Sequence, residues 1–434
     1  MTSISSPRSA VAGRTLSPGI AYALVAAVVG LALFASATPS PLYEVYARLW
    51  GLSPIVLTLV YATYAFGVLT SLLLAGRVSD EVGRRPVLLV ALGALIATSV
   101  LFTLAGSVVW LFVARGVQGL ATGLALGAAS AALLDLHPRG DPAGVGLTNG
   151  VASAGGLGVG ALVSAAIVQL LPAPRVLPYV VLLILFAVAF TGALRLPEPV
   201  GRRSALRLTP QRPSVPRSVR RPFLLAALAV TSSWSIGGLF LALGPELSGR
   251  LFDTTNHLVT GVDVFLLAGA GSVAQLAFGR RAPWAGAAGG SVALAAGMAL
   301  VVVAASTDSA ALLVTGALVG GAGFGVAFLG ALRVLSGAIP PDQRGAVMSA
   351  FYVVAYTALS IPAVLAGIAV TSLGLRSTFE LFGGVVGVLA LVVAAEAWRT
   401  RPPARERHAV APPTRRHRAS RRRSGEGRPC PESA

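Results

Sequence analysis

Lysine is absent from this 434-residue sequence, and all 34 basic residues are arginines. A Walker-type phosphate loop ends in Gly-Lys-Ser or Gly-Lys-Thr, so the chain cannot bind a nucleotide in that way. The single cysteine, Cys430, leaves no intrachain disulfide and no cysteine zinc cluster. The histidines lack metal-ligand spacing. We therefore expect no metal site, and we expect solvated loop positions for His137, His257, His408 and His417.

Charged residues are also scarce. They make up 12% of the chain, against roughly 25% in soluble proteins, while 55% of the residues are hydrophobic. A bilayer core about 30 Å thick needs about 20 apolar residues per helical span, and helices satisfy their own backbone in lipid. The sequence predicts an all-α integral membrane fold of twelve spans: Gly19–Ala37, Pro54–Ala75, Pro86–Ala105, Val108–Leu134, Ala143–Leu171, Pro178–Leu196, Pro222–Gly244, Leu258–Phe278, Pro283–Ala305, Ala310–Leu332, Gly345–Leu373 and Thr378–Trp398.

The net charge of +18 is concentrated in alternate loops and at the two ends of the chain, not on a folded face that could bind nucleic acid. Arginine accumulates in cytoplasmic loops of membrane proteins, so both termini are predicted to be cytoplasmic, in the plasma (inner) membrane. The expected organisation is a cytoplasmic segment (1–18), a six-helix bundle (19–197), a basic cytoplasmic linker (198–221), a second six-helix bundle (222–398) and a disordered basic cytoplasmic tail (399–434).

The N-terminus permits one alternative. Arg8 and Arg14, the first apolar run and Ala35-Ser36-Ala37 together imitate a signal peptide with its cleavage site. Cleavage would leave eleven spans and would break the symmetry between the two halves.

That symmetry shows as an internal repeat. A shift of about 202 residues aligns residues of the two halves, and repeats of this kind mark transporters with a site between the repeats. The aligned residues are Gly119 with Gly321, Gly123 with Gly325, Pro138 with Pro340 and, one step further, Gly76-Arg77 with Gly279-Arg280.

The loop after the second span reads Gly76-Arg77-Val78-Ser79-Asp80-Glu81-Val82-Gly83-Arg84-Arg85-Pro86. It resembles the signature of the major facilitator superfamily between helices two and three. The resemblance implies twelve helices in two pseudo-symmetric halves and a loop that latches the cytoplasmic side. It also implies that Asp80 meets the start of helix eleven near Gly345. The predicted latch residues are Gly76, Arg77, Asp80, Gly83, Arg84, Arg85 and Asp135, with Arg77, Arg84 or Arg85 as the partner of Asp135.

Two charged residues fall inside apolar runs. Arg115-Gly116-Val117-Gln118-Gly119 resembles the helix-four motif of proton-coupled members, and a charge inside the membrane is a functional-site hypothesis. Gln118 shares a face with Arg115. Asp263 lies at a similar depth, where opposite charges invite pairing, so we predict proton coupling through Arg115, Gln118 and Asp263. The alternatives are an Arg115 that snorkels to the interface and a helix that starts later, with Asp263 at its outer mouth.

Helix five resembles the glycine-rich motif of antiporter members, although the expected proline is missing. Close packing through small residues explains its glycines equally well; they are Gly146, Gly150, Gly155, Gly156 and Gly160. Helices two, seven, eight and eleven line the cavity in this family. The resemblance therefore implies a cavity wall of Tyr61, Tyr64, Trp234, Gln275, Tyr352 and Tyr356.

Residues Thr38 to Tyr43 resemble a stretch of drug-efflux-like bacterial members. We therefore expect a monomeric secondary transporter, driven by the proton gradient without a cofactor, that exports lipophilic or cationic small molecules. An uptake symporter for a sugar or organic acid is the alternative within the same fold. A membrane enzyme or a permease subunit is disfavoured because the sequence has no G-x-S-x-G or H-E-x-x-H motif, and no catalytic residue is assigned.

Overall fold

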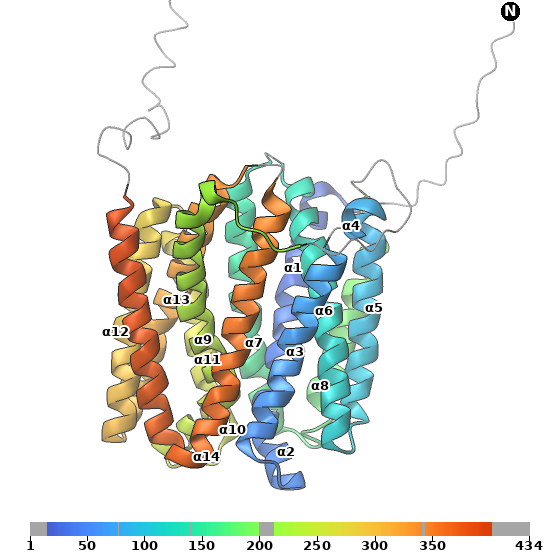
Figure 1. The fold of residues 1–434 in the computed structure, drawn as a ribbon. Coiled ribbons are helices and arrows are strands. Elements are labelled where there is room, and N and C mark those ends of the chain that lie inside the picture. The colour runs from blue at the N-terminus through green and yellow to red at the C-terminus, as the bar shows by residue number, and fades with distance from the viewer. Residues whose placement is uncertain (1–14, 77, 139, 199–211, 341–342, 402–434) are drawn as a thin grey trace, which may run out of the picture. The chain divides into compact units, whose positions relative to one another are not determined.

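The structure is a computed structural model that describes residues 15–76, 78–138, 140–198, 212–340 and 343–401. These residues form helices joined by short connections (Figure 1). The helices are α1 (Pro18–Ala37), α2 (Leu42–Trp50), α3 (Pro54–Ala75), α4 (Val78–Glu81), α5 (Arg84–Thr103), α6 (Val108–Leu136), α7 (Pro142–Leu170), α8 (Leu177–Ala193), a 3-10 turn η1 (Arg217–Val219), α9 (Arg220–Leu251), α10 (His257–Thr260), α11 (Val262–Phe278), α12 (Pro283–Thr307), α13 (Ala310–Ala338) and α14 (Arg344–Arg399).

The prediction of twelve spans is confirmed for the described part of the chain. Ten stretches are long and apolar enough to cross a bilayer, and α8 is a shorter apolar helix. The twelfth span lies within α14, whose 56 residues would be about 84 Å long as one straight helix. Gly374 divides α14 because its φ of +80° is a left-handed conformation that favours glycine.

Proline and polar caps set several helix starts. The first turns of α1, α3, α7, α8 and α12 each contain proline, which costs least there because the first N–H groups of a helix have no intrahelical acceptor. Asp141 caps α7 by accepting the N–H groups of Ala143 and Gly144 at 3.0 and 3.1 Å.

Three predicted boundaries were wrong. The tenth span was predicted to end at Leu332, but α13 continues to Ala338. The seventh span was predicted to end at Gly244, but α9 continues through Pro245 to Leu251. The eighth span was predicted to begin at Leu258, but a short α10 precedes α11, which begins at Val262. Hydropathy gives the length of an apolar segment, but it does not show where a helix ends or where the backbone changes direction.

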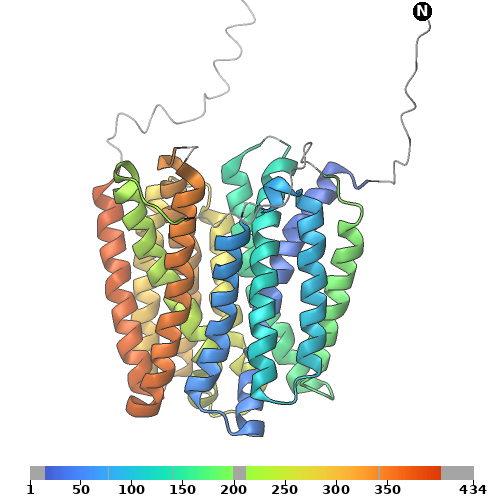
Figure 2. The ribbon, with the colours of Figure 1, turned by 45° about the vertical axis from the view of Figure 1, so that its right-hand side comes forward.

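Helices α1 to α8 gather on one side in Figure 2 and helices α9 to α14 on the other. One helix crossing occurs in both groups. A Cβ on Gly119 would collide with the backbone carbonyl of Tyr64, and a Cβ on Gly321 would collide with that of Leu267. Both crossings therefore need glycine at the contact. The α3–α6 pair thus corresponds to the α11–α13 pair, with offsets of 202 residues between α6 and α13 and 203 between α3 and α11.

Figure 1 shows α4 at one end of the helices and α2 and α10 at the other. We call these the α4 end and the α2–α10 end. The predicted disordered tail, most of the basic linker and the first fourteen residues lie outside the described residues.

Candidate functional site

Arg115 lies inside the helical bundle, about 10 Å along α6 from its first residue, Val108. Its side chain is 1% exposed. Nε and Nη2 donate to the Tyr43 hydroxyl at 3.1 and 2.6 Å, and Nη1 donates to the Ser36 carbonyl at 3.0 Å and to Gln118 Oε1 at 2.8 Å. The guanidinium is therefore held by α1, α2 and α6 and does not reach out to the interface.

All four of these bonds go to neutral oxygens. The guanidinium also lies 5.6 Å from the ring centre of Tyr43 and 5.3 Å from that of Tyr64, which is within the range of cation–π attraction. Gln118 in turn donates to the Ala35 carbonyl at 2.9 Å. The positive charge is thus solvated by dipoles and aromatic faces and has no counter-ion among these contacts.

Asp263 is in the first turn of α11 and is 4% exposed. Its Oδ1 accepts the N–H of Val264 at 2.7 Å, whereas Oδ2 accepts no hydrogen bond from any described residue. The helix does start later than predicted, as the alternative reading supposed. The carboxylate is nonetheless buried between α9, α11 and α13.

Arg115 and Asp263 do not pair with each other. The donors of Arg115 are directed to α1, α2 and α6, and Asp263 contacts its own helix, so the expected ion pair is not formed. The repeated crossing places the two residues at matching levels: Arg115 is one turn before Gly119 in α6, and Asp263 is one turn before Leu267 in α11. Among the described residues, Arg115 in one half and Asp263 in the other are therefore buried ionisable side chains without an ion-pair partner.

Four of the six predicted cavity residues meet where the halves face each other. Tyr64 of α3 packs with Tyr356, Tyr352 and Trp234, and the Trp234 and Tyr356 rings meet edge to face at 5.1 Å. The Tyr61 hydroxyl is buried and has no partner among described groups. The rings of Tyr64, Trp234, Tyr352 and Tyr356 thus form one cluster, here called the aromatic wall. That it borders a substrate cavity stays a prediction.

Gln275 lies apart from this wall, at the contact between α7 and α11. Its Nε2 donates to the Gly325 carbonyl at 3.2 Å, and its Oε1 faces Gly150, where a Cβ would approach it to 2.5 Å. Gln275 is therefore hydrogen-bonded within the second half and only packs against α7 of the first half.

The predicted packing glycines of α7 face two neighbours. Gly156 and Gly160 abut the backbone of α1, and Gly150 and Gly155 face α11. Gly146 differs, because no atom of the structure lies within 4 Å of where its Cβ would stand. Four of the five glycines thus allow α7 to approach helices of both halves, and the packing role does not apply to Gly146.

At the α4 end, Arg84 holds the predicted latch loop together. Its Nε donates to Asp135 Oδ2 at 3.0 Å and its Nη1 to Ser79 Oγ at 2.8 Å. Nη1 also pairs with Asp80. Among the three candidates, Arg84 is therefore the partner of Asp135 in the described structure; Arg77 lies outside the described residues.

The expected contact of Asp80 with helix eleven is not formed. Asp80 contacts Arg84, four residues later, and its side chain is 56% exposed. The nearby guanidinium in its own loop satisfies the carboxylate, so Asp80 does not reach the N-terminus of α14. Gly76, by contrast, closes α3 in a helical conformation.

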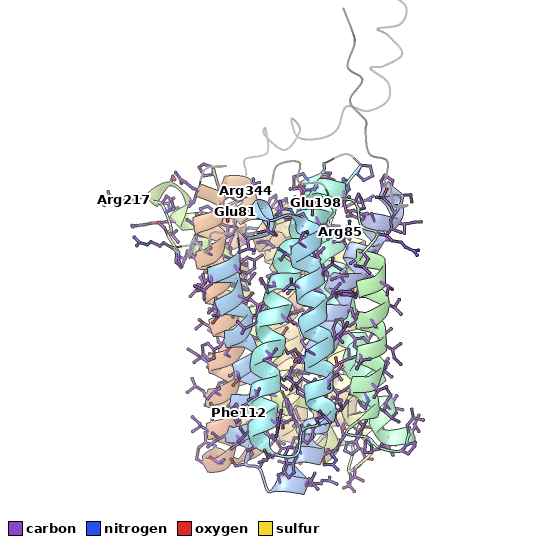
Figure 3. The ribbon with its side chains drawn as sticks, turned by 90° about the vertical axis from the view of Figure 1, so that its right-hand side faces the viewer. Glu81, Arg85, Phe112, Glu198, Arg217 and Arg344 are labelled. Carbon is purple, nitrogen blue, oxygen red and sulfur yellow. The ribbon has the colours of Figure 1, made fainter. Side chains whose placement is uncertain are left out.

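Glu198, which no pattern in the sequence singles out, binds the latch loop at the same end. Its two carboxylate oxygens accept the N–H groups of Arg84 and Arg85 at 2.9 and 3.0 Å, so a negative charge caps the positive end of α5. Gly83 is required there, because its φ is +115° and a Cβ would lie 2.6 Å from Glu198 Oε2. Figure 3 shows Arg85 and Glu198 together at the α4 end, far from Phe112.

The α2–α10 end is closed by a hydrogen bond between the two halves. Ser40 Oγ donates to the Leu241 carbonyl at 2.6 Å. In a regular helix that carbonyl would accept the N–H of residue 245, which is proline and has none. Pro245 therefore frees the carbonyl of Leu241 for Ser40. The Ser164 hydroxyl supports the same segment by donating to the Thr38 carbonyl at 2.6 Å.

The family model described as Major Facilitator Superfamily matches residues 25–361, which is more than three quarters of the chain. The chain belongs to the Major Facilitator Superfamily.

A solved member of similar fold is the human organic anion transporter MFSD10 (TETRAN). Its crystal structure aligns with a TM-score of 0.64 and 19% sequence identity, over 87% of this chain and all of that one. No curated protein sequence is significantly similar to the chain. Membership of the Major Facilitator Superfamily makes this protein a multi-pass membrane transporter of small molecules and not an enzyme.

One histidine of this superfamily member, His257, is not the solvated loop residue that the sequence predicted. The His257 N–H donates to Gln169 Oε1 at 2.8 Å, and His257 Nδ1 lies 3.6 Å from Glu44 Oε2. Both contacts join the two halves at the α2–α10 end. His137 ends α6 and packs edge to face on Tyr22.

Proposed function

We propose that this transporter exports lipophilic or cationic small molecules in exchange for protons, with the α4 end in the cytoplasm. The arginine-rich loops lie at this end, which supports the orientation. The coupling groups are Arg115 with Gln118 in one half and Asp263 in the other. The two halves rock about the aromatic wall, so that the binding site faces one side of the membrane at a time.

The observation that carries this proposal is the pair of buried ionisable side chains, Arg115 and Asp263, which lie at matching levels of the two halves and have no ion-pair partner among the described residues. A charged side chain inside a membrane protein is costly and marks an ion or substrate pathway. Asp263 has an oxygen without a partner, so it can take up and release a proton. Arg115 keeps a fixed positive charge in the other half, which repels a cation and favours its binding near Asp263.

Contacts at the two ends of the bundle support alternating access. In this structure the Ser40 bond to Leu241 and the contacts of His257 join the halves at the α2–α10 end. The Arg84 network at the other end stays within one half. Opening of the α2–α10 end therefore requires the Ser40 and His257 contacts to break.

Transport in proteoliposomes with an imposed pH gradient tests the proposal. An exporter moves a lipophilic cation against the proton flow, whereas an uptake symporter for a sugar or organic acid moves its substrate with it. Arg115→Ala should abolish proton-driven flux while the purified protein remains monodisperse. Undiminished proton-driven flux in that variant would refute the role of Arg115.

A second candidate is the transport of organic anions. The guanidinium of Arg115 has no carboxylate partner, and the solved structure of similar fold is named as an organic anion transporter. The same proteoliposomes separate the two candidates: an organic anion that is carried, with a cation that is not, favours the second.

A further inference from the structure

Three arginines gather at the α4 end of the C-terminal half, where α11, α12 and α13 meet. Arg280 and Arg281 lie in the connection between α11 and α12, and both are exposed. Arg333 comes from α13, and its Nη1 donates to the carbonyls of Gly279 and, at 3.0 Å, of Arg281. Arg281 and Arg333 also line one small hollow. We call Arg280, Arg281 and Arg333 the arginine cluster.

No carboxylate of a described residue forms an ion pair with the arginine cluster. The corresponding loop of the first half differs, because Asp80 and Asp135 both pair with Arg84 there. At the offset of 202 residues between α6 and α13, Asp135 corresponds to Gly337, and the connection 279–282 contains no acidic residue. The second half therefore has arginines at this place without the carboxylates that balance them in the first half.

Aromatic side chains around the arginine cluster mark the level of the membrane interface. The guanidinium carbon of Arg281 lies 4.9 Å from the ring centre of Phe278, which is within the range of cation–π attraction. Trp284, in the first turn of α12, meets Trp398 of α14 edge to face, with ring centres 6.0 Å apart. Phe278 is 44% exposed and Trp398 is 56% exposed. Tryptophan collects at the level of the lipid headgroups, so the arginine cluster lies beside them.

We propose that the arginine cluster binds the phosphate of an anionic phospholipid headgroup in the leaflet at the α4 end. Guanidinium groups present N–H donors that match phosphate oxygens, and basic pockets between spanning helices bind anionic headgroups. The hollow has a volume of about 10 Å³, which is too small for a phosphate, so the headgroup lies at its rim against Arg280 and Arg281. This interaction does not depend on the direction or the substrate of transport.

The surroundings favour a phospholipid over a soluble phosphate ion. The exposed rings of Phe278 and Trp398 offer apolar area next to the arginines, and a phospholipid can cover this area while its phosphate binds the guanidinium groups. The latch loop of the first half should not bind the same headgroup, because its carboxylates already pair with Arg84 and repel a phosphate.

Quenching of tryptophan fluorescence by brominated lipid tests the site, because Trp284 and Trp398 lie close to it. The purified full-length protein is placed in phosphatidylcholine bilayers that contain a small fraction of brominated phosphatidylglycerol. Quenching should exceed that by the same fraction of brominated phosphatidylcholine, and the excess should shrink at high salt. Equal quenching by the two brominated lipids would overturn the proposal.

The signal can be assigned to the site by removing its reporters. Trp284→Phe together with Trp398→Phe should abolish most of the excess quenching. The other tryptophans lie in the aromatic wall and in α2 and α6; they are Trp234, Trp50 and Trp110. Excess quenching that survives in the double variant would place the bound lipid elsewhere and refute the site.

Charge variants separate a site from a general attraction of anionic lipid to a basic surface. Arg280→Gln with Arg281→Gln should weaken the binding of phosphatidylglycerol about 10-fold or more, because each arginine near the headgroups adds to the attraction. The matched control is Arg220→Gln with Arg221→Gln, which removes the same charge from an exposed pair at the start of α9. The control should bind nearly as the wild type does. An equal loss in both double variants would refute the site.

Inorganic phosphate distinguishes the two sources of a phosphate group. At a constant ionic strength, replacing chloride with inorganic phosphate should leave the excess quenching by phosphatidylglycerol unchanged. Relief of the quenching by phosphate would show that a soluble anion occupies the arginine cluster, and it would overturn the assignment to a lipid.

Discussion

The hydrogen bond between Ser40 and the Leu241 carbonyl should control opening of the α2–α10 end. It is 2.6 Å long and joins the two halves, so it must break when that end opens. A hydrogen bond contributes about 1 kcal/mol net, and 1.4 kcal/mol is a factor of ten in an equilibrium constant. Ser40→Ala should therefore raise the population open at this end about 5-fold.

Pro245→Ala should have a similar effect for a different reason. The new N–H of residue 245 can donate to the Leu241 carbonyl within the helix, so it competes with Ser40 for that oxygen and weakens the bond between the halves. Because both substitutions act on the same bond, the double variant should open little more than either single variant. This non-additivity distinguishes the proposed bond from two independent effects on packing.

The unique Cys430 makes the assay simple, since Cys430→Ser leaves no native thiol. Ser36→Cys then places one thiol in a buried segment beneath the α2–α10 end. A membrane-impermeant maleimide, added outside right-side-out vesicles, should label it about 5-fold faster in the Ser40→Ala background. Equal labelling rates with and without Ser40→Ala, or additive effects of Ser40→Ala and Pro245→Ala, would refute the reasoning.

Three further outcomes are expected. Gly83→Ala should destabilise the protein by about 1–3 kcal/mol, because it imposes backbone strain at a positive φ and crowds Glu198. The control is Gly146→Ala, which meets no neighbour. Equal melting temperatures of the Gly83→Ala and Gly146→Ala variants would contradict the account. Glu198→Gln should lower stability by about 1 kcal/mol through loss of charge at a helix N-terminus, and this loss should shrink in high salt. Gln169→Ala should speed labelling of the Ser36→Cys reporter more than His257→Ala does. The reason is that the backbone N–H of His257 donates to the Gln169 side chain, so the His257→Ala variant keeps this bond and the Gln169→Ala variant loses it. The reverse order of labelling rates would be inconsistent with this contact.

Much of the fold could be predicted from the sequence because lipid constrains a spanning segment in length and polarity. The residues 54–75 and 108–136 show this, since their helices begin where the apolar runs begin. The break between α10 and α11 was missed. The break falls at Gly261, after a short α10 whose start is set by Asn256, because its Oδ1 accepts the N–H of Leu258 at 2.9 Å. Neither feature changes the hydropathy.

The sequence predicted which residues belong to the candidate site better than it predicted which residues they contact. A buried arginine was visible in the sequence because charge inside an apolar run is rare. Its partners Tyr43 and Ser36 come from other helices, so no spacing along the chain announces them. Glu198 is the first acidic residue after the sixth span, but its capping of α5, more than 100 residues earlier, arises only from the tertiary fold.

The most direct test of the account measures substrate and proton movement together in the same proteoliposomes. Substrate efflux and internal pH are followed for the wild type, Arg115→Ala and Asp263→Asn. The account predicts opposite flows of substrate and protons in the wild type and loss of the proton flow in both variants. Proton flow that persists unchanged in Asp263→Asn, with substrate still exchanged, would contradict it.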